Sequence, residues 1–380
     1  MRKLVAAFAL LFFAAPLLLW AGGVRARPFE NRPMAPRPAL SDGWDAFDGA
    51  TRFFVDRLPL REQAVRANTW VSVNVFDTTP DYSGGEENAL PFGKPEQPAK
   101  PTPTPAPGAA PPPTGVLKGR DGWLFLEADL QNACKPSIAW DEAMRRYRRL
   151  IELIRDSGRK VAFVIPPDKS TVYSRYLPKD GFAEQDCYAA GKREGWRRVE
   201  DAGLPELLPL RKTMLAGRAD PPQESYWPED THWNTKGGVQ AARAVLEHLD
   251  GPPIRESEIV KGRVEHTGDL AALIGANATR TGPDWKIQRP AGAPVYPGRT
   301  AFLIDSFGPT LAVGLTPYMQ ELVPADWLTT PADQLIQAIV AADTVILEKV
   351  ERDVTYLVSD AGIVTPAFMD ALEAALAAAG

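Results

Sequence analysis

The densest group of side chains suited to chemistry is the segment Asp230-Thr231-His232-Trp233-Asn234. It directly precedes a segment with the apolar spacing of a helix, so we expect it on a loop, where catalytic groups commonly lie. If this loop turns suitably, Asp230 accepts a hydrogen bond from one ring nitrogen of His232 and leaves the other nitrogen free as a base. Taken alone, the same residues also fit an ordinary loop that caps a helix.

A base of this kind needs a nucleophile, and Ser306 is the candidate. It follows the apolar run 300–304, which predicts a strand, so it would lie at the carboxyl end of a parallel strand, where open α/β sheets place ligand sites. Backbone N–H groups at the start of a following helix would then hold an oxyanion. With His232 taking the Ser306 proton and Asp230 orienting the imidazole, the three residues predict acyl transfer through an acyl-serine. The alternative from spacing alone is an ordinary turn serine.

Further polar and aromatic residues are candidates for contact with a substrate, and each also has a structural interpretation. The aspartate and lysine that follow the apolar run 160–165 fit a cleft or a turn with an ion pair. The aromatic residues fit a sugar-stacking surface or the core, and the asparagine fits an oxyanion donor or a helix cap. These candidates are Asp168, Lys169, Tyr226, Trp227, Trp233 and Asn234.

The remaining imidazoles and thiols offer little further chemistry. His248 is expected on a solvated helix face and His266 in a loop. No further His or Cys lies near Asp230 and His232 in sequence, so we expect no metal site, and the acyl-transfer chemistry needs no organic cofactor. With two cysteines, Cys134 and Cys187, the chain is no disulfide-rich scaffold, and these two are a candidate disulfide or two separate buried thiols.

The elements that must position these groups alternate along the chain from about residue 116. Alternating helices and short apolar strands predict an α/β domain with a mainly parallel sheet. A helix that starts after Asn234 or Thr235 would place the polar loop, and Thr365 would cap the last helix with Pro366 at its first position. The strands are expected at 122–126, 160–165, 300–304 and 344–350, and the other helices at 141–157, 311–322 and 334–341.

The N-terminal part of the chain has a different character. Residues 4–21 are apolar and uncharged, with Arg2 and Lys3 before them, which predicts a membrane anchor, or a cleaved signal, with the rest of the chain exported. Nine prolines between Pro95 and Pro113 predict an extended linker or insertion. The expected organisation is an anchor or signal at 1–24, a helical extension at 25–80, a Pro-rich linker at 81–115 and a catalytic domain at 116–380.

Composition excludes other classes of function. The chain has 380 residues, long enough to bury a core without added crosslinks, and a net charge of -5 from 43 basic and 48 acidic side chains. A dedicated nucleic-acid-binding protein would carry a basic domain, so no nucleic acid partner is expected.

Seven short motifs resemble, in the same order, those of the alginate O-acetyltransferase family of the AlgJ and AlgX type. No single motif is decisive, but their order from about residue 28 to about residue 355 is specific. The motifs are Glu30-Asn31-Arg32, Asp56-Arg57-Leu58-Pro59-Leu60-Arg61, Lys118-Gly119-Arg120-Asp121-Gly122-Trp123-Leu124-Phe125-Leu126, Pro166-Pro167-Asp168-Lys169, Tyr176-Leu177-Pro178, Asp230-Thr231-His232-Trp233-Asn234 and Asp305-Ser306-Phe307.

The resemblance implies a three-layer α/β/α domain of the SGNH hydrolase-like class, with the Asp-x-His pair and the later serine as its triad. It also implies an O-acetyltransferase that acts on hydroxyls of an exported polysaccharide such as alginate. A membrane-bound acyltransferase would supply the acetyl group, and the domain would lie in the periplasm, anchored to the inner membrane. Ile304 stands where a Gly-Asp-Ser motif would have glycine, which leaves the oxyanion hole undefined.

Two other functions are compatible with the same residues. A carbohydrate acetylesterase would use the same triad and differ in letting water reach the acyl-enzyme. A non-catalytic polysaccharide-binding or secretion scaffold protein would keep the fold without a reactive serine.

Overall fold

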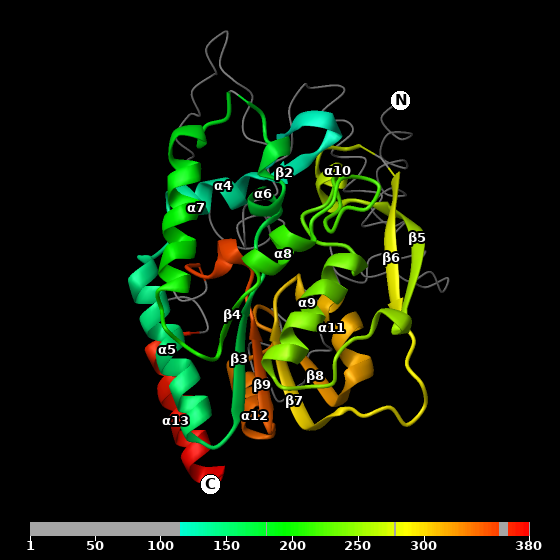
Figure 1. Ribbon diagram of the computed structural model, residues 1–380. Helices are drawn as coiled ribbons and strands as arrows, with labels where there is room; N and C mark the ends of the chain where they lie inside the picture. Colours follow the sequence, from blue (N-terminus) through cyan, green and yellow to red (C-terminus); the bar gives the residue numbers. More distant parts are fainter. Residues whose placement is uncertain (1–114, 180, 277–278, 357–363, 380) are drawn as a thin grey trace, which may run out of the picture. The chain divides into compact units, whose positions relative to one another are not determined.

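Five parallel strands form the central sheet of the computed structural model, which describes residues 115–379 except 180, 277–278 and 357–363 (Figure 1). All four pairs of neighbouring strands are parallel. This confirms the α/β class with a mainly parallel sheet. In spatial order the strands are β4 (Leu207–Pro209), β3 (Lys160–Ile165), β9 (Thr344–Glu348), β7 (Tyr296–Ile304) and β8 (Met319–Asp326).

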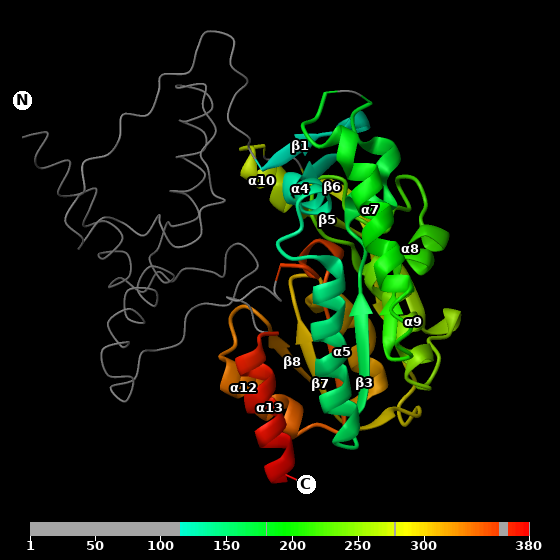
Figure 2. The ribbon, with the colours of Figure 1, turned by 90° about the vertical axis from the view of Figure 1, so that its left-hand side faces the viewer.

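Helices cover both faces of this sheet, because the inner strands are apolar on both sides. In β3, Val161 and Phe163 belong to one buried cluster, and Ala162 and Val164 to the other. Figure 2 shows the layers edge-on. One face packs against α5 (Trp140–Asp156), α12 (Ala332–Val340) and α13 (Pro366–Ala379), and the other against α8 (Arg211–Gly217), α9 (Thr235–His248) and α11 (Gly308–Leu315).

The other elements pack around the sheet and these helices (Figure 1). Two antiparallel pairs are formed by β1 (Val116–Lys118) with β2 (Leu124–Leu126), and by β5 (Ile259–Thr267) with β6 (Thr279–Ile287). The remaining α-helices are α4 (Glu127–Cys134), α6 (Lys169–Val172), α7 (Gln185–Glu200) and α10 (Asp269–Leu273). Short 3-10 turns are η2 (Arg120–Gly122), η3 (Ser174–Tyr176), η4 (Glu256–Glu258), η5 (Thr316–Tyr318) and η6 (Glu351–Asp353).

Both helix starts inferred from capping residues are confirmed. The Asn234 side chain accepts a hydrogen bond from the Gly237 amide at the start of α9. The Thr365 hydroxyl accepts one from the Phe368 amide at the start of α13, with Pro366 as the first helical residue. A cap satisfies a backbone N–H that has no partner within the helix, so it is readable from sequence alone.

The helix expected at 311–322 is wrong in its second half. The helix α11 ends at Leu315, the turn η5 contains Pro317, and β8 then runs from Met319 parallel to β7. Pro317 has no N–H to donate to the carbonyl four residues earlier, and its ring crowds the preceding turn, so the α-helix does not continue through it. The apolar residues that follow, including Leu322, pack from the strand rather than from a helix.

The predicted anchor or signal at 1–24, helical extension at 25–80 and Pro-rich linker at 81–115 fall almost entirely outside the described residues. Among the residues that the structure does describe, no helix has both the length and the apolar character to cross a membrane. Residues 115–272 and 276–380 group together as one unit.

A disulfide joins Cys134, at the end of α4, to Cys187, in the first turn of α7. The two Cα atoms lie 5.4 Å apart, and the bridge closes a loop with a sequence separation of 53 residues. In the chain-entropy account, a loop of this length removes about 4 kcal/mol of unfolded-state entropy. The bridge therefore fastens two helices that both flank the carboxyl ends of the central strands.

We expect the double variant Cys134→Ser, Cys187→Ser to lose about 2–4 kcal/mol of unfolding free energy, because its unfolded chain gains loop freedom. Urea unfolding of the full chain measures this loss. Wild-type protein held in reductant is the control and should match the variant. An unchanged midpoint and slope for the variant would show that the bridge adds nothing to stability.

Candidate active site

The carboxyl ends of three neighbouring strands bring the candidate residues to one edge of the sheet. Because β9 lies between β3 and β7, the residues that follow these strands converge. Asp168 follows β3, Arg352 follows β9, and Ser306 follows β7. Ser306 is exposed, whereas Asp168 is fully buried. The predicted nucleophile is therefore at the surface of the edge at which parallel sheets hold ligands.

Asp230 is a buried carboxylate held by four hydrogen bonds. Its Oδ1 lies 2.8 Å from His232 Nδ1 and accepts a second bond from the His232 amide at 2.8 Å. Its Oδ2 lies 2.8 Å from His266 Nε2 and accepts a bond from the Asp269 amide at 3.0 Å. The structure thus joins Asp230 to the His232 ring, as the sequence predicts.

The charges of this pair support each other. Burial alone would raise the pKa of Asp230, but the hydrogen bonds from His232 and His266 outweigh it and hold that pKa well below its usual value. Burial would lower the pKa of His232, but its hydrogen bond to the Asp230 carboxylate and that group's charge raise it instead. Asp230 therefore stays ionised and stabilises a protonated His232.

The other ring nitrogen of His232 is left available. Nε2 is buried and has no hydrogen-bond partner among the described residues. When Nδ1 carries the proton donated to Asp230, Nε2 is the acceptor, which is the arrangement a general base requires.

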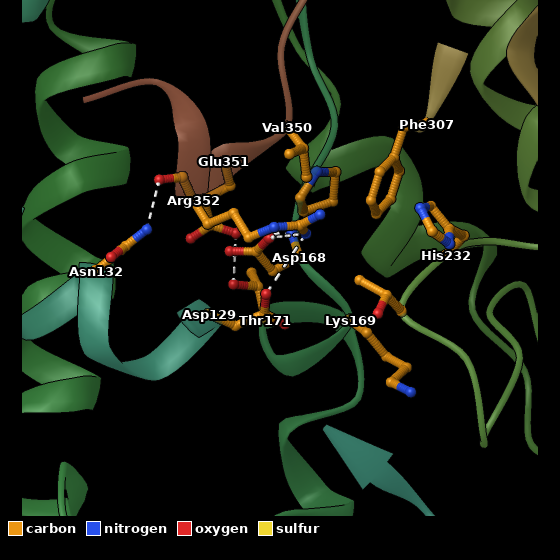
Figure 3. Close-up of polar contacts among 12 residues, drawn as sticks. Asp129, Asn132, Asp168, Lys169, Thr171, His232, Phe307, Val350, Glu351 and Arg352 are labelled. Carbon is orange, nitrogen blue, oxygen red and sulfur yellow. Dashed lines mark hydrogen bonds and ion pairs between the residues drawn. The ribbon is translucent and has the colours of Figure 1, made fainter. Parts of the chain in front are cut away.

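The turn that carries Ser306 is fastened to the His232 loop. The Trp233 indole donates a hydrogen bond to the Phe307 carbonyl at 3.1 Å, and the Phe307 ring centroid lies 5.1 Å from that of His232. Gly238 of α9 packs so closely on Thr310 of α11 that a Cβ would lie 2.6 Å from the Thr310 carbonyl oxygen. Figure 3 shows the His232 imidazole beside the Phe307 ring, so the base lies against the residue that follows Ser306.

Asp305 fixes the serine turn to the sheet. Its Oδ1 accepts a hydrogen bond from the Phe307 amide at 2.9 Å, and its Oδ2 accepts one from the Val350 amide at 2.7 Å. The Asp305 amide donates to Glu348 Oε2 at 3.0 Å. The loop after β7 is therefore tied both to the last residue of β9 and to the loop that follows β9.

Lys169 and Asp168, predicted to contact substrate, are instead fully buried. The Lys169 ammonium donates to the carbonyls of Trp227, Pro228 and Asp230 at 3.2, 3.0 and 2.5 Å. Burial lowers the pKa of Lys169 to about 8. Asp168 forms ion pairs with Lys192 at 2.5 Å and Arg352 at 3.1 Å. Both side chains hold loops in place, since their polar atoms face the protein interior.

The other predicted contact residues are also buried. Tyr226 and Trp233 are at most 1% exposed and Trp227 is 7% exposed. Tyr226 donates its hydroxyl hydrogen to the Pro167 carbonyl at 2.6 Å. Asn234 caps α9, and its amide nitrogen donates to the Glu224 carbonyl at 2.8 Å. These aromatic rings pack in the core beneath the loop, which favours the core and helix-cap interpretations of these residues over the sugar-stacking and oxyanion ones.

His266 is the site residue that the sequence analysis missed. It lies in strand β5 rather than in a loop, opposite Arg280 of β6, and its ring stacks on Trp227 with centroids 4.5 Å apart. Arg280 pairs with Glu229 at 2.7 Å, and Gly282 leaves no room for a Cβ beside the Trp227 ring. The β5–β6 ribbon therefore packs against the loop that carries Asp230 and His232. Only the nearby polar run at 266–269 hinted at this role.

One group of side chains has the composition of a metal site. Single ligand atoms of Asp230, His232 and Asp269 lie within 4.8 Å of one another. Burial and the charge of Asp230 raise the pKa of Asp269. Both Asp230 oxygens already accept N–H donors, and Asp269 accepts from the Thr231 amide at 2.7 Å. A cation would have to displace these bonds, so we assign the group to hydrogen bonding.

The fold is an α/β domain with a parallel central sheet, and the candidate site pairs the buried Asp230 with His232 close to the turn of Ser306 at the carboxyl edge of that sheet. Residues 116–294 match the family described as the SGNH hydrolase-like domain of the acetyltransferase AlgX. The resemblance read from the short motifs is confirmed for this part of the chain. The matched range contains Asp230 and His232 and ends before Ser306.

Individual proteins give a consistent comparison. The chain is 28% identical over 171 residues to a protein named probable alginate O-acetylase AlgJ of Pseudomonas putida. That match spans 42% of this chain and 42% of the relative, so less than half of the relative's length is covered.

Solved structures of similar proteins include the O-acetyltransferase domain of Pseudomonas putida AlgJ and PatB1 of Bacillus cereus. The first is 20% identical, with a TM-score of 0.47, covering 68% of this chain and 99% of that one. The second is 14% identical, with a TM-score of 0.46, covering 63% of this chain and 96% of that one.

We expect the rate of Ser306-dependent turnover to rise with pH through an apparent pKa above the usual value of about 6.5, because His232 must be neutral to act as a base and Asp230 raises its pKa. The variant Asp230→Asn should move this rise, the acid limb of the pH–rate profile, to lower pH. It should also lower kcat by about 10²–10⁴-fold. Initial rates across pH measure both. An unchanged acid limb in the variant would show that Asp230 does not set the pKa of His232.

We expect His266→Ala to lower kcat about tenfold with little change in KM, because Asp230 Oδ2 loses one donor, a loss of about 1–2 kcal/mol. His266→Gln retains an N–H donor and should lose less. Steady-state kinetics measure the difference, with His248→Gln at the end of α9 as the matched control. Equal rates for wild type and His266→Ala would show that the bond does not orient Asp230.

Proposed function

We propose that this protein is a serine-dependent O-acetyltransferase that acts on hydroxyls of an exported polysaccharide. The observation that carries the proposal is the geometry of His232. Asp230 orients its ring through Nδ1, and its buried Nε2 has no partner among the described residues and lies beside the turn of Ser306. The family match over residues 116–294 and the name of the similar AlgJ protein support acetyl transfer and alginate-type acceptors.

The reaction would proceed in two balanced halves. Ser306 Oγ attacks the acetyl carbonyl while His232 Nε2 takes its proton, and that proton passes to the leaving oxygen of the donor as its bond to the acetyl carbon breaks. A sugar hydroxyl then gives its proton to His232 and attacks the acetyl-serine. The bond to Ser306 breaks and the proton returns to Ser306 Oγ. Asp230 stays ionised throughout.

The surroundings of this reaction are part of the same proposal. The apolar run 4–21 would anchor the chain in the inner membrane, with the catalytic domain in the periplasm. A membrane-bound acyltransferase would deliver the acetyl group to Ser306. No organic cofactor takes part in either half of the reaction.

The test gives the full chain and its Ser306→Ala variant an activated acetyl ester, with and without oligosaccharide acceptors that include oligomers of alginate. We expect acetylated oligosaccharide from the wild type alone. We also expect an acetyl adduct of ~42 Da on wild-type Ser306. Intact-protein and product mass spectrometry measure both.

The other outcomes separate the rival functions. Free acetate that depends on Ser306, with no acetylated sugar from any acceptor, would identify an esterase. Equal behaviour of wild type and Ser306→Ala, without adduct or turnover, would overturn the triad and favour a binding or scaffold protein.

A further inference from the structure

The serine turn lacks most of the backbone donors that usually stabilise an oxyanion. The Phe307 amide donates to Asp305 Oδ1, and the Gly308 amide donates to the Asp305 carbonyl at 3.1 Å. Pro309 has no N–H, and Asn234 is committed to capping α9. An acetyl transfer at Ser306 develops negative charge on the carbonyl oxygen. Among the described residues the Ser306 amide has no partner and is the donor that this turn offers, so a second donor must come from outside the turn.

Four largely buried cations lie at this edge of the sheet, and two of them are engaged with partners outside the turn. Lys169 donates to three loop carbonyls, and Lys192 pairs with Asp168 at 2.5 Å and Glu351 at 3.0 Å. Lys349 has no hydrogen-bond partner among the described residues, but its Nζ lies 3.7 Å from Asp305 Oδ2 and 5.6 Å from the centroid of the Trp327 ring, on the face of the sheet opposite α9 and α11. The fourth is Arg352, which follows β9.

The Arg352 guanidinium lies against the residue next to Ser306. Its central carbon is 5.3 Å from the centroid of the Phe307 ring. Figure 3 shows this side chain reaching between Asp168 and Asp129 on one side and Phe307 on the other, with His232 beyond the ring. Its positive charge also acts against protonation of His232, which places it within electrostatic reach of the base.

The guanidinium is held firmly but not saturated. Nη1 lies 3.1 Å from Asp168 Oδ1 and 3.4 Å from Asp129 Oδ1. The other two nitrogens, Nε and Nη2, have no hydrogen-bond partner among the described residues, although a guanidinium offers five donors in a fixed plane. The side chain is 8% exposed, so these donors lie in a nearly dry site, where a charge acts more strongly than in water.

We propose that Arg352 supplies the oxyanion-stabilising donor for acetyl transfer at Ser306, with Asp129 and Asp168 fixing its orientation. The inference rests on the proposed acyl-serine function. The buried carboxylates keep the guanidinium charged, since they hold the pKa of Arg352 above its usual value against the effect of burial. Arg352 then acts as a catalytic residue, and Phe307 is the surface on which its plane rests.

The first experiment compares Arg352→Gln with wild type in Ser306-dependent acetyl release from the activated ester. We expect kcat to fall by about 10²–10³-fold with KM changed less than about threefold, because the donor acts in the transition state. Thermal unfolding checks that the variant is folded. The matched control is Arg289→Gln, which removes another buried arginine that stacks on a ring, Tyr318 at 4.0 Å, and pairs with Glu258 at 3.5 Å.

A second comparison separates catalysis from support of the loops. Added guanidinium ion should restore part of the Arg352→Gln activity. Asp129→Asn, which keeps the guanidinium, should lose less than about tenfold. If Arg352→Gln does not fold, Arg352→Lys replaces it, and a lower kcat at unchanged KM supports the role.

Three results would overturn the proposal. One is an Arg352→Gln or Arg352→Lys activity within about threefold of wild type. Another is a loss in Asp129→Asn as large as in Arg352→Gln, without rescue by guanidinium, which would mean that Arg352 only supports the fold. The last is turnover that persists in Ser306→Ala. That result would overturn the proposed acyl-serine function itself, and the Ser306→Ala variant distinguishes it from a failure of the Arg352 proposal alone.

Discussion

A carboxylate buried as deeply as Asp230 must be surrounded by donors, and this requirement organises the candidate site. The four N–H groups that meet it come from the loop before α9, from strand β5 and from the start of α10. If one of these hydrogen bonds were missing, the buried charge would lack a donor. The free-energy cost would be well above the contribution of a hydrogen bond exposed to water. The loop, the ribbon and the short helix are therefore held in one arrangement, and the orientation of His232 follows from it.

A second buried group acts on the same loop from below. The Lys169 ammonium donates hydrogen bonds to three backbone carbonyls of the loop, those of Trp227, Pro228 and Asp230. The loop therefore contacts a buried cation as well as surrounding the buried Asp230 carboxylate. The serine turn is tied in turn to the loop by Trp233 and to the sheet by Asp305. The candidate nucleophile and base are thus placed by interior contacts, although Ser306 itself is exposed.

Local signals in the sequence were sufficient for some features and insufficient for others. The strand 160–165 and the caps at Asn234 and Thr365 were predictable because burial on both faces and capping are properties of short segments. Strand β5 was not, because residues 260–265 are exposed and show no apolar alternation. Its role depends on pairing with β6, which places His266 beside Asp230 across 36 residues.

The same reasoning explains why the candidate site was only partly predictable. Asp230 and His232 are two residues apart, so their contact is a local property. The burial of Tyr226, Trp227 and Lys169 depends on how the loop folds over the sheet, and residue type alone does not report it. Arg352 offered no signal, because its neighbours Asp129 and Asp168 come from distant segments.

The position of β9 sets the order in which the molecule can be completed during synthesis. This strand lies between β3 and β7, with Thr344 paired to Lys160 on one side and Thr300 on the other. Until residues 344–348 have left the ribosome, the pair β4–β3 and the pair β7–β8 have no strand to join them into one sheet. The long-range contacts between the two pairs can form only after that strand is available. A nascent chain therefore carries Asp230, His232 and Ser306 before the central strand that frames them, and the candidate site can assemble only after residues 344–348 have been synthesised.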